Sequence, residues 1–459
     1  MQWKSIILAA GEGTRLRSKI NKVMHNVADL PLLGHVLRAV SEAGCSSPIV
    51  VVSPKRPEVA TYAQNFLPAT QVAYQAEQLG TAHAAQCGLA QVQGQGQDDA
   101  PMFIVFADTP LIQPHTFRDI LEVFTSDNLD VLVLAMEAET PNAYGRLIQG
   151  QDGQVQQIIE ARDATVNQLK ITLCNSGMMV ARTSVLQQLL PRIQNINAQR
   201  EYYLPDVVAL AHQAGLKVGH HVISQEEALG VNTRQDLSRV EAAFQARARQ
   251  EAMTRGVTLI APETVFFAHD TQIEADVILH PHVVFGPGVA VASDAEIFSY
   301  SHLEGCQVES GARIGPFARL RPGTVIGERV HIGNFVEVKN AHIAEGAKAN
   351  HLSYIGDASV GSDANIGAGT ITCNYDGFTK SQTVIGAGAF VGSNTALVAP
   401  VTVGAGAIIG AGSVITANVA DDMMVVVRAD RRDVAGGAKK FRAAKKAAKE
   451  TKNLKSIGE

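Results

Sequence analysis

The hydrophobic pattern of the first half of the chain alternates between short apolar runs and longer polar segments. The apolar runs lie at residues 5–10, 48–53, 101–108 and 130–137, and the segments between them suit helices. Unbroken apolar runs of this length are typical of strands in a parallel sheet that is buried on both faces. The pattern therefore predicts an α/β domain over residues 1–232.

A helical stripe follows this domain. Leu237, Val240 and Phe244 fall on one face of a segment that contains no proline. An apolar stripe with this spacing indicates an amphipathic helix. We expect a linker helix over residues 233–253.

From about residue 257 the period changes to six. Aliphatic residues recur at every sixth position in two long series, and glycine directly follows many of them. Six residues suit one flat side of a three-sided β-solenoid, with the aliphatic side chain pointing inward. A glycine-rich loop region is the alternative, but loops do not keep one phase over so many residues. The series are Val308, Ile314, Leu320, Ile326, Ile332 and Val338, then Ile385, Val391, Leu397, Val403, Ile409 and Ile415.

Composition narrows the class of protein. The formal net charge of −5 gives no general reason to expect binding to nucleic acid or membranes. The first apolar run is too short for a signal peptide, and no run reaches the length of a membrane-spanning helix. The five cysteines are scattered, which is typical of free thiols in a reducing cytoplasm and argues against a structural zinc site. The basic tail at 429–459 is expected to be solvated and partly helical or disordered, with nucleic-acid binding as the weaker alternative.

The segment LAAGEGTRL at residues 8–16 directly follows the first predicted strand. Gly11 and Gly13 let the backbone approach a ligand, and backbone N–H groups in such a loop can face phosphate oxygens. A dinucleotide fingerprint would need glycine where Leu16 stands, and the Gly-Lys-Ser/Thr of a Walker loop is absent. Arg15 and Lys22 add two cations, which suits a triphosphate under attack.

Further motifs follow in a characteristic order: QAEQLGTAHA at 75–84, FADTPL at 106–111, YGR at 144–146 and CNSGMM at 174–179. With them, the first half resembles the sugar-phosphate nucleotidyltransferases. Together with the six-residue repeats, residues 4–428 resemble the family of bifunctional N-acetylglucosamine-1-phosphate uridylyltransferases and glucosamine-1-phosphate acetyltransferases. The resemblance implies a Rossmann-like domain at 1–232, the linker helix, and a left-handed parallel β-helix of hexapeptide repeats at 254–428.

The resemblance also implies the chemistry. Such an enzyme is cytoplasmic and makes UDP-N-acetylglucosamine from glucosamine 1-phosphate, acetyl-CoA and UTP, with Mg²⁺. Asp108 and Asn232 would be the Mg²⁺ ligands, in keeping with the preference of this ion for oxygen donors. The family usually has Tyr-Gly where this chain has Phe106-Ala107, which affects contacts to the ribose or sugar and leaves the metal ligand in place. The other implied contacts of the first site are Leu8, Ala9, Ala10 and Gly11 with the nucleotide, Gln75, Gly80 and Thr81 with uracil, Arg15 and Lys22 with phosphates, and Gly145, Glu160 and Asn175 with the sugar and its N-acetyl group.

The second site would lie on the solenoid. A histidine with an ordinary pKa of about 6.5 can accept the proton that an amine must lose before attack, so His351 is the candidate general base. Arg321 and Lys339 provide fixed positive charge for a sugar phosphate. The remaining implied contacts are Tyr354 and Asn365 with the acceptor sugar, Ala368, Ser393, Ala411 and Arg428 with acetyl-CoA, and Asn374 and Tyr375 with both.

One segment interrupts the repeat, TCNYDGFTKSQT at residues 372–383. A loop that leaves the stack adds nothing to its interior. In related hexapeptide acyltransferases three solenoids pack side by side, with sites between them. We therefore expect a homotrimer in which this loop brings Asn374 and Tyr375 to a shared site; a surface insertion without a role is the alternative.

Two other functions compete with this interpretation. One is a single-activity nucleotidyltransferase, such as an enzyme that makes ADP-glucose, with a regulatory solenoid. The other is a non-catalytic assembly subunit, as in the translation exchange-factor proteins that share both domain types. Arg321, Lys339 and His351 argue against the first, and the intact N-terminal motif argues against the second.

Overall fold

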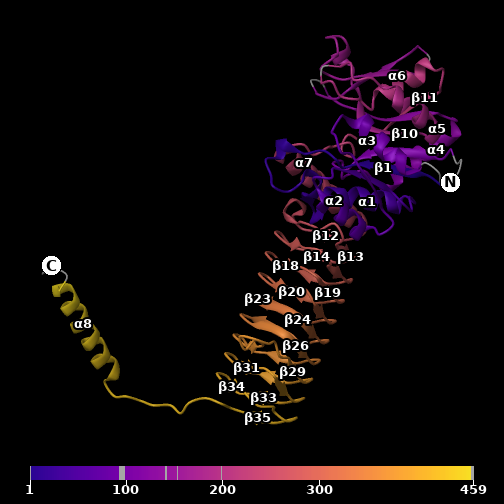
Figure 1. The fold of residues 1–459 in the computed structure, drawn as a ribbon. Coiled ribbons are helices and arrows are strands. Elements are labelled where there is room, and N and C mark those ends of the chain that lie inside the picture. The colour runs from indigo at the N-terminus through magenta and orange to yellow at the C-terminus, as the bar shows by residue number, and fades with distance from the viewer. Residues whose placement is uncertain (1, 93–98, 140–141, 152, 198, 456–459) are drawn as a thin grey trace. The chain divides into compact units, whose positions relative to one another are not determined.

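The structure is a computed structural model that describes residues 2–92, 99–139, 142–151, 153–197 and 199–455. Figure 1 shows the chain as a ribbon, and its contacts group it into two compact units. The first unit comprises Met1–Asp294 and His302–Gly305, and the second comprises Ala295–Ser301 and Cys306–Glu459. The first coils of the solenoid thus belong to the same unit as the N-terminal sheet.

The N-terminal sheet is mixed, which corrects the expectation of a parallel sheet. Its strands run in the order β11-β7-β10-β6-β1-β4-β5, and β10 is antiparallel to both of its neighbours. The sequence did not predict this strand because its CNSGMM motif was interpreted as a binding segment, and it is inserted between two strands that the apolar runs did predict, β6 and β7. The strands are β1 (Lys4–Leu8), β4 (Ile49–Val52), β5 (Gln71–Tyr74), β6 (Pro101–Phe106), β7 (Val131–Glu137), β10 (Leu173–Arg182) and β11 (Val218–Val222), with β8 (Arg146–Gln149) and β9 (Val155–Ile159) off the edge of β10 and a separate pair β2 (Asn26–Val27) and β3 (Leu30–Pro31).

Helices bury both faces of this sheet, as the unbroken apolar runs predicted. Successive residues of β1 point to opposite sides, so that Ile7 packs with Phe103 and Phe117 while Ile6 packs with Leu89 and Ile104. All six side chains are buried. The helices are α1 (Leu32–Glu42), α2 (Pro57–Phe66), α3 (Thr81–Leu89), α4 (Pro114–Ser126), α5 (Thr183–Leu189) and α6 (Asp206–Gln213).

Helix α7 (Arg234–Thr254) forms where the linker helix was expected. A capping box starts it, because the Thr233 side chain accepts from the backbone of Asp236 and the Asp236 carboxylate accepts from the backbone of Thr233. The predicted stripe packs inward, with Val240 and Phe244 in a cluster that also contains Leu16. The sequence therefore located both the helix and its buried face.

The six-residue period corresponds to a left-handed parallel β-helix, and all twelve aliphatic positions of the two series are buried. Ile314 pairs with Ile332, so one ordinary coil spans 18 residues. Val360 pairs with Ile385, so the coil with the inserted loop spans 25. The strands of the first unit are β12 (Thr258–Leu259), β13 (Gln272–Ile273), β14 (Ile278–Leu279), β15 (Val284–Phe285), β16 (Ala290–Val291) and β18 (His302–Leu303). Those of the second unit are β17 (Glu296–Ile297), β19 (Cys306–Val308), β20 (Arg313–Ile314), β21 (Arg319–Leu320), β22 (Thr324–Ile326), β23 (His331–Asn334), β24 (Glu337–Ile343), β25 (Lys348–His351), β26 (Tyr354–Val360), β27 (Asn365–Ile366), β28 (Ile371–Cys373), β29 (Thr383–Ile385), β30 (Phe390–Val391), β31 (Ala396–Val398), β32 (Val401–Val403), β33 (Ile408–Ile409), β34 (Val414–Ile415) and β35 (Met424–Val425).

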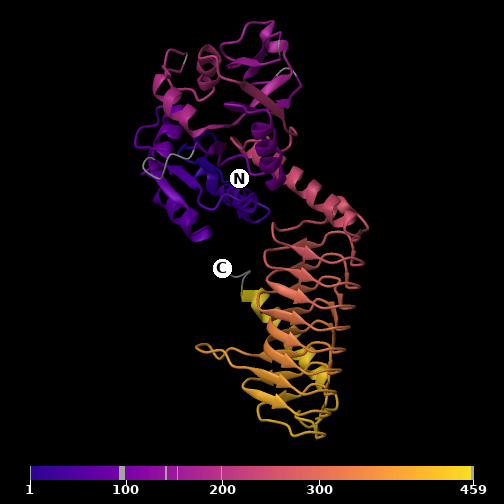
Figure 2. The same cartoon turned by 90° about the vertical axis from the view of Figure 1, so that its right-hand side faces the viewer.

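The inserted loop forms a small β-hairpin over residues 374–381, which leaves the stack of coils (Figure 2). Tyr375 and Lys380 form an antiparallel bridge, and the Asp376 carboxylate accepts from the backbone N–H groups of Phe378 and Thr379. Such a carboxylate-capped turn gives the hairpin a defined shape without packing. Phe378 lies at its tip with 93% of its surface exposed.

The basic tail contains helix α8 (Gly437–Lys455), so the helical part of the expectation is confirmed. The last four residues of the tail, 456–459, lie outside the described residues. Among the residues that the structure describes, no helix is both long enough and apolar enough to cross a membrane.

Candidate active sites

A cavity of about 860 Å³ opens at the carboxyl ends of the central strands in the first unit. Strands β1 and β6 are adjacent and parallel, and the chain continues from β1 to β4 on the other side. This is the topological switch point of the sheet, where open α/β folds bind ligands. All but one of the residues predicted for the first site line the cavity: Leu8, Ala9, Ala10, Gly11, Arg15, Lys22, Gln75, Gly80, Thr81, Phe106, Asp108, Gly145, Glu160, Asn175 and Asn232.

Ala107 is the exception. Its side chain is fully buried in the core, and its backbone N–H donates to the carbonyl of Leu8 at 3.1 Å. Successive side chains point to opposite sides along the end of β6, so Phe106 faces the cavity and Ala107 faces away from it. The Ala107 side chain therefore does not line this cavity, whereas Phe106 forms part of the wall.

Four polar side chains from distant parts of the sequence meet at one end of the cavity. Lys22 forms an ion pair with Asp108, and both side chains are 14% exposed. The amide oxygen of Asn232 accepts from Lys22 at 3.3 Å and from Arg15 at 2.8 Å. A largely buried ion pair brings little net stability because desolvation opposes the attraction, so function is the better explanation for placing these groups here.

Glycine allows one of these contacts. Gly13 has a left-handed backbone (φ 64°), and a Cβ at this position would overlap the side chain of Lys22. The turn after β1 thus needs glycine both for its conformation and for the close approach of Lys22. Asn232 is positioned from the other side, because its backbone N–H donates to Asp236 in the capping box of α7 at 3.1 Å.

The residues predicted to contact uracil lie around the start of α3. The Gln75 amide donates to the Gly80 carbonyl at 3.1 Å, and the Thr81 hydroxyl accepts from the backbone of Leu204 at 3.0 Å. Gln78, which sequence reasoning missed, donates to the Ala10 carbonyl at 2.8 Å and so ties this segment to the glycine loop.

The residues predicted to contact the sugar lie where β8, β9 and β10 meet. The backbone N–H of Asn175 donates to the Gly145 carbonyl at 2.8 Å, which brings the two predicted contacts together. Burial raises the pKa of Glu160, and the nearby carboxylates of Asp163 and Asp206 raise it further. A half-buried carboxyl group of this kind is suited to accept hydrogen bonds from sugar hydroxyls.

The oxygens of Asp108 and Asn232 fit a magnesium ion. Both approach one cationic nitrogen, Nζ of Lys22, so their spacing suits a shared cation. At a nucleotide, Mg²⁺ is usually bound by one or two protein oxygens, and phosphate and water provide its other ligands. Among the described residues, no group of three or more His, Cys, Asp or Glu side chains is arranged to hold a metal.

On the β-helix, His351 has a partner that sequence reasoning missed. Nδ1 of His351 lies 2.6 Å from the side-chain oxygen of Asn334, which stands opposite it in the pairing of β23 with β25. An amide oxygen can only accept, so Nδ1 carries the proton and Nε2 is the nitrogen that can take one up. The 17-residue separation of these two side chains across one coil was the signal that could have revealed the pair.

The predicted phosphate-binding cations lie beside this histidine's coil. Arg321 donates to the Glu337 carboxylate at 2.7 Å, and Lys339 lies next to Lys380 of the hairpin. A hydrogen bond from Lys380 and the charges of Lys380 and Arg321 lower the pKa of Lys339. A phosphate bound between these cations would offset their mutual repulsion, so the arrangement suits a phosphate.

The other predicted residues of the second site belong to successive coils and to the hairpin. Asn374 is buried at the base of the hairpin, and the Tyr375 hydroxyl donates to the Gly377 carbonyl at 2.6 Å. Arg428 donates to the Ala411 carbonyl at 3.2 Å, which joins two of the predicted acetyl-CoA contacts. Tyr354, Asn365 and Ala368 are half-buried, whereas Ser393, Ala411 and Arg428 are exposed.

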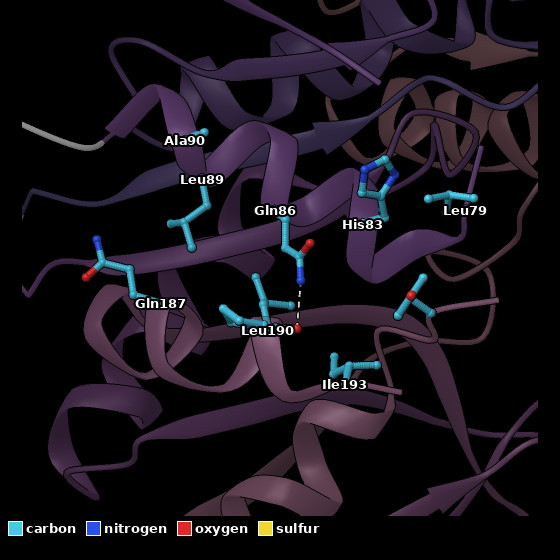
Figure 3. Close-up of a pocket in the computed structure, with 10 residues that line it drawn as sticks. Leu79, His83, Gln86, Leu89, Ala90, Gln187, Leu190 and Ile193 are labelled. Atoms are coloured by element: carbon cyan, nitrogen blue, oxygen red, sulfur yellow. Dashed lines mark hydrogen bonds between the residues drawn. The ribbon is translucent and has the colours of Figure 1, made fainter. Parts of the chain in front are cut away.

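A second cavity of about 490 Å³ lies on another face of α3 and is distinct from the candidate site. Figure 3 shows Gln86 pointing across it, where its amide donates to the Leu190 carbonyl at 2.7 Å. None of its ten lining residues is an acid, a lysine or an arginine. It therefore lacks the charges that the nucleotide chemistry requires.

Comparison with known proteins identifies the family. The MobA-like NTP transferase domain matches residues 5–229, and the bacterial transferase hexapeptide repeat matches residues 305–340 and 382–417. The bifunctional protein GlmU of Zymomonas mobilis is 47% identical and aligns over 97% of this chain and 98% of its own. The GlmU proteins of Azorhizobium caulinodans and Xanthobacter autotrophicus are 48% and 49% identical, each over 96% of this chain and 97% of its own. The chain belongs to the GlmU family.

Membership of the GlmU family confirms the family expected from the motifs and the expectation of an enzyme with two transferase activities. The mixed sheet and the β-helix are the nucleotidyltransferase and hexapeptide parts of a GlmU chain. Both competing functions, a single-activity enzyme and a non-catalytic subunit, disagree with it. A solved UDP-glucose pyrophosphorylase covers 54% of this chain at 16% identity with a TM-score of 0.44, which is too low to establish a common fold.

Proposed function

We propose that this enzyme makes UDP-N-acetylglucosamine in two steps, with acetyl transfer on the β-helix and uridylyl transfer in the N-terminal cavity. The acetyl group passes from acetyl-CoA to the amine of glucosamine 1-phosphate. The phosphate of N-acetylglucosamine 1-phosphate then attacks UTP, and pyrophosphate leaves. The observation that carries the proposal is the convergence of Arg15, Lys22, Asp108 and Asn232 in one cavity with the predicted base and sugar contacts.

In the uridylyl step this arrangement orients the reactants and offsets charge. Arg15 and Lys22 hold the phosphates of UTP, and Glu160 and Asn175 hold the sugar so that its phosphate faces the α-phosphorus. Asp108 and Asn232 would hold Mg²⁺, which would supply positive charge beside the phosphates when bound. Lys22 is paired with Asp108 in this structure, and its ammonium group would be available to contact phosphate if that carboxylate bound the metal.

In the acetyl step His351 acts as the general base. Asn334 keeps the proton on Nδ1, so Nε2 accepts the proton that the sugar amine loses on attacking the thioester carbonyl. Arg321 and Lys339 hold the sugar phosphate, with Tyr354 and Asn365 beside the sugar. Ala368, Ser393, Ala411 and Arg428 hold acetyl-CoA along the wall of the helix, and the small side chains leave room for its pantetheine arm.

We propose that the enzyme is a cytoplasmic homotrimer assembled through its β-helix. The support is the hairpin at 374–381, which places an almost fully exposed phenylalanine away from the coils. The hairpin is ordered by its own hydrogen bonds, so it could present this side chain to a neighbouring copy at a low cost in entropy. Asn374 and Tyr375 at its base would then complete a site shared with a neighbouring copy. We retain residues 1–232, 233–253, 254–428 and 429–459 as the functional divisions of the chain.

One incubation tests the two steps together. Purified enzyme is given glucosamine 1-phosphate, acetyl-CoA, UTP and Mg²⁺, and free thiol and pyrophosphate are followed. We expect both products, with pyrophosphate release dependent on acetyl-CoA. Thiol without pyrophosphate would contradict the uridylyl assignment, and Phe106 would be the first residue to examine. Pyrophosphate that does not depend on acetyl-CoA would contradict the order of the two steps.

A further inference from the structure

Three polar side chains form a ladder at the corner of the β-helix from which the hairpin departs. Asn340, Asp357 and Asn374 are 17 residues apart in sequence and lie on successive coils. The Asn340 amide donates to one carboxylate oxygen of Asp357 at 2.6 Å, and the Asn374 amide donates to the other. Both carboxylate oxygens of Asp357 are therefore bonded to side chains, one on each side of its own coil.

The upper end of this ladder is the base of the hairpin. The carbonyl of Asn374 accepts from the backbone N–H of Ser381 at 2.9 Å, which closes the hairpin at its neck. Asn374 is also buried, in contrast to the exposed residues 375–380 that follow it. The bond from Asn374 to Asp357 thus links the neck of the hairpin to the wall of the β-helix.

Asp357 occupies a corner of the solenoid with a left-handed backbone. Asp357 has a left-handed conformation (φ 47°), as does Asn340 below it (φ 44°). Aspartate and asparagine tolerate this region better than most side chains, but it is still unfavourable. Other left-handed corners of the same solenoid carry glycine, as at Gly369 (φ 73°), or a side chain, as at Asp363 (φ 55°). The conformation is thus shared by many corners, and what Asp357 adds is a carboxylate that is hydrogen-bonded on both sides.

The groups around Asp357 favour the ionised form of its carboxylate. Burial alone would raise the pKa of Asp357, but hydrogen bonds from Asn340 and Asn374 and the charges of Lys380 and Lys339 hold it below its usual value. The carboxylate therefore stays ionised at neutral pH. It faces two lysines that repel each other, one from the wall and one from the hairpin.

We propose that Asp357 is the positioning residue of the acetyltransferase site, where its carboxylate fixes Asn374 and the neck of the hairpin in the arrangement that receives acetyl-CoA. The inference rests on the proposed function, because Asn374 contacts acetyl-CoA only if the β-helix transfers acetyl groups. Asp357 itself acts through Asn374 and needs no contact with either substrate. The uridylyl step does not depend on it.

The decisive variant is Asp357→Gly. Glycine keeps the left-handed backbone without strain and removes both hydrogen bonds and the charge. We expect the KM for acetyl-CoA to rise about tenfold or more, the loss typical of a hydrogen bond to a charged group, while kcat at saturation changes less. Asp363→Gly is the matched control, since Asp363 also has a left-handed backbone (φ 55°) at another corner of the solenoid. We expect its KM to stay within about twofold of the wild type.

Asp357→Asn separates hydrogen bonding from charge. Asparagine can still accept from Asn374 and can donate to Asn340 once that amide is turned round, so the ladder survives without its charge. We expect a rise in the KM for acetyl-CoA of less than about threefold. The proposal would be overturned if Asp357→Asn and Asp357→Gly had equal effects and mainly changed the KM for glucosamine 1-phosphate. That result would show that only the charge matters.

Pyrophosphate release from UTP and N-acetylglucosamine 1-phosphate, measured in each variant, reports on the N-terminal site and should not change. A normal KM for acetyl-CoA in Asp357→Gly would overturn the inference and leave the proposed function intact. Absence of acetyl transfer in the wild type would instead contradict the proposed function. If Asp357→Gly does not assemble, Asp357→Asn remains the test. A rise of tenfold or more in its KM for acetyl-CoA, although the ladder is intact, would also contradict the inference.

Discussion

Single hydrogen bonds prepare individual side chains for chemistry in both candidate sites. Lys22 is held by Asp108 and Asn232, and His351 is held by Asn334. In each pair a residue named by a motif is oriented by one that lies far away in the sequence or outside any motif. Orientation of this kind lowers the cost of reaching the reactive geometry.

Asn334 provides a direct test at this scale. Asn334→Leu removes the acceptor of the Nδ1 proton, so the imidazolium formed during acetyl transfer loses one hydrogen bond. A hydrogen bond to a charged group contributes about 1.5 kcal/mol or more, so we expect kcat for acetyl transfer to fall at least about tenfold. Thiol release at saturating substrates measures it. Asn334→Asp keeps an acceptor and should retain more activity than Asn334→Leu; the reverse order would contradict the role.

His35 provides a test of stability against pH. Burial lowers its pKa to about 4, with Arg38, His269 and Arg247 contributing, while its Nε2 lies 2.8 Å from the Val27 carbonyl. Between about pH 6.5 and pH 4 the unfolded chain binds a proton at this residue and the native chain does not. The free energy of unfolding therefore falls as the pH drops through this window, by up to about 3 kcal/mol from this group.

Urea unfolding of the wild type and of His35→Gln at pH 7.5 and pH 5 measures this contribution. Glutamine can still donate to the Val27 carbonyl but does not titrate. The variant should lose less stability than the wild type over this range. Equal losses in the two proteins would show that His35 does not contribute to the pH dependence.

The hairpin at 374–381 is ordered although it does not pack into the stack of coils. Its turn is capped by Asp376 and its neck is closed by Asn374, so it is shaped before any partner binds. A preorganised segment loses less entropy on binding than a flexible one. Helix α7 shows the opposite case, since its capping box and its buried stripe both act within one unit.

Phe378→Ser tests the proposed assembly through this element. Burial of a phenylalanine side chain contributes about 1.5–3 kcal/mol, so its loss should weaken association and acetyl transfer about tenfold or more at low protein concentration. Sedimentation velocity and thiol release over a dilution series measure the two effects. Ile196→Ser is the control, because Ile196 is 86% exposed in the N-terminal unit. A wild-type protein that is fully active as a monomer would contradict the assembly.

At the scale of the whole molecule, the two candidate sites use described residues from different units. Residues of the nucleotide cavity all precede residue 237, and those of the acetyl site all follow residue 320. A bifunctional chain of this kind should lose its activities independently. We expect Asp108→Asn to reduce uridylyl transfer at least about a hundredfold without affecting acetyl transfer.

His351→Gln should give the opposite pattern. Neither variant alone should convert glucosamine 1-phosphate to UDP-N-acetylglucosamine, whereas a mixture of the two should do so through released N-acetylglucosamine 1-phosphate. Chromatography of the nucleotide sugar measures this. Loss of both activities in either single variant would contradict two independent sites.

The period of six placed the β-helix, the apolar stripe placed the linker helix, and the unbroken apolar runs placed four strands of the sheet. These features are local, because the direction of each side chain follows from the backbone geometry of its own segment. Motifs in the right order were sufficient to name most of the cavity. They did not reveal that β10 runs antiparallel, that Ala107 points into the core, or that the loop folds as a hairpin.

The pairings that make the sites work depend on long-range contacts. Lys22 and Asp108 are 86 residues apart, and Asn232 reaches Arg15 across 217. The partners of His351 and Asn374 are 17 residues away, on the preceding coil. Which side chains meet across coils and strands depends on register and on the closure of the chain between them, and neither is encoded in any short segment. The residue types needed for the chemistry can therefore be recognised along the sequence, but their partners become visible only after the chain has folded.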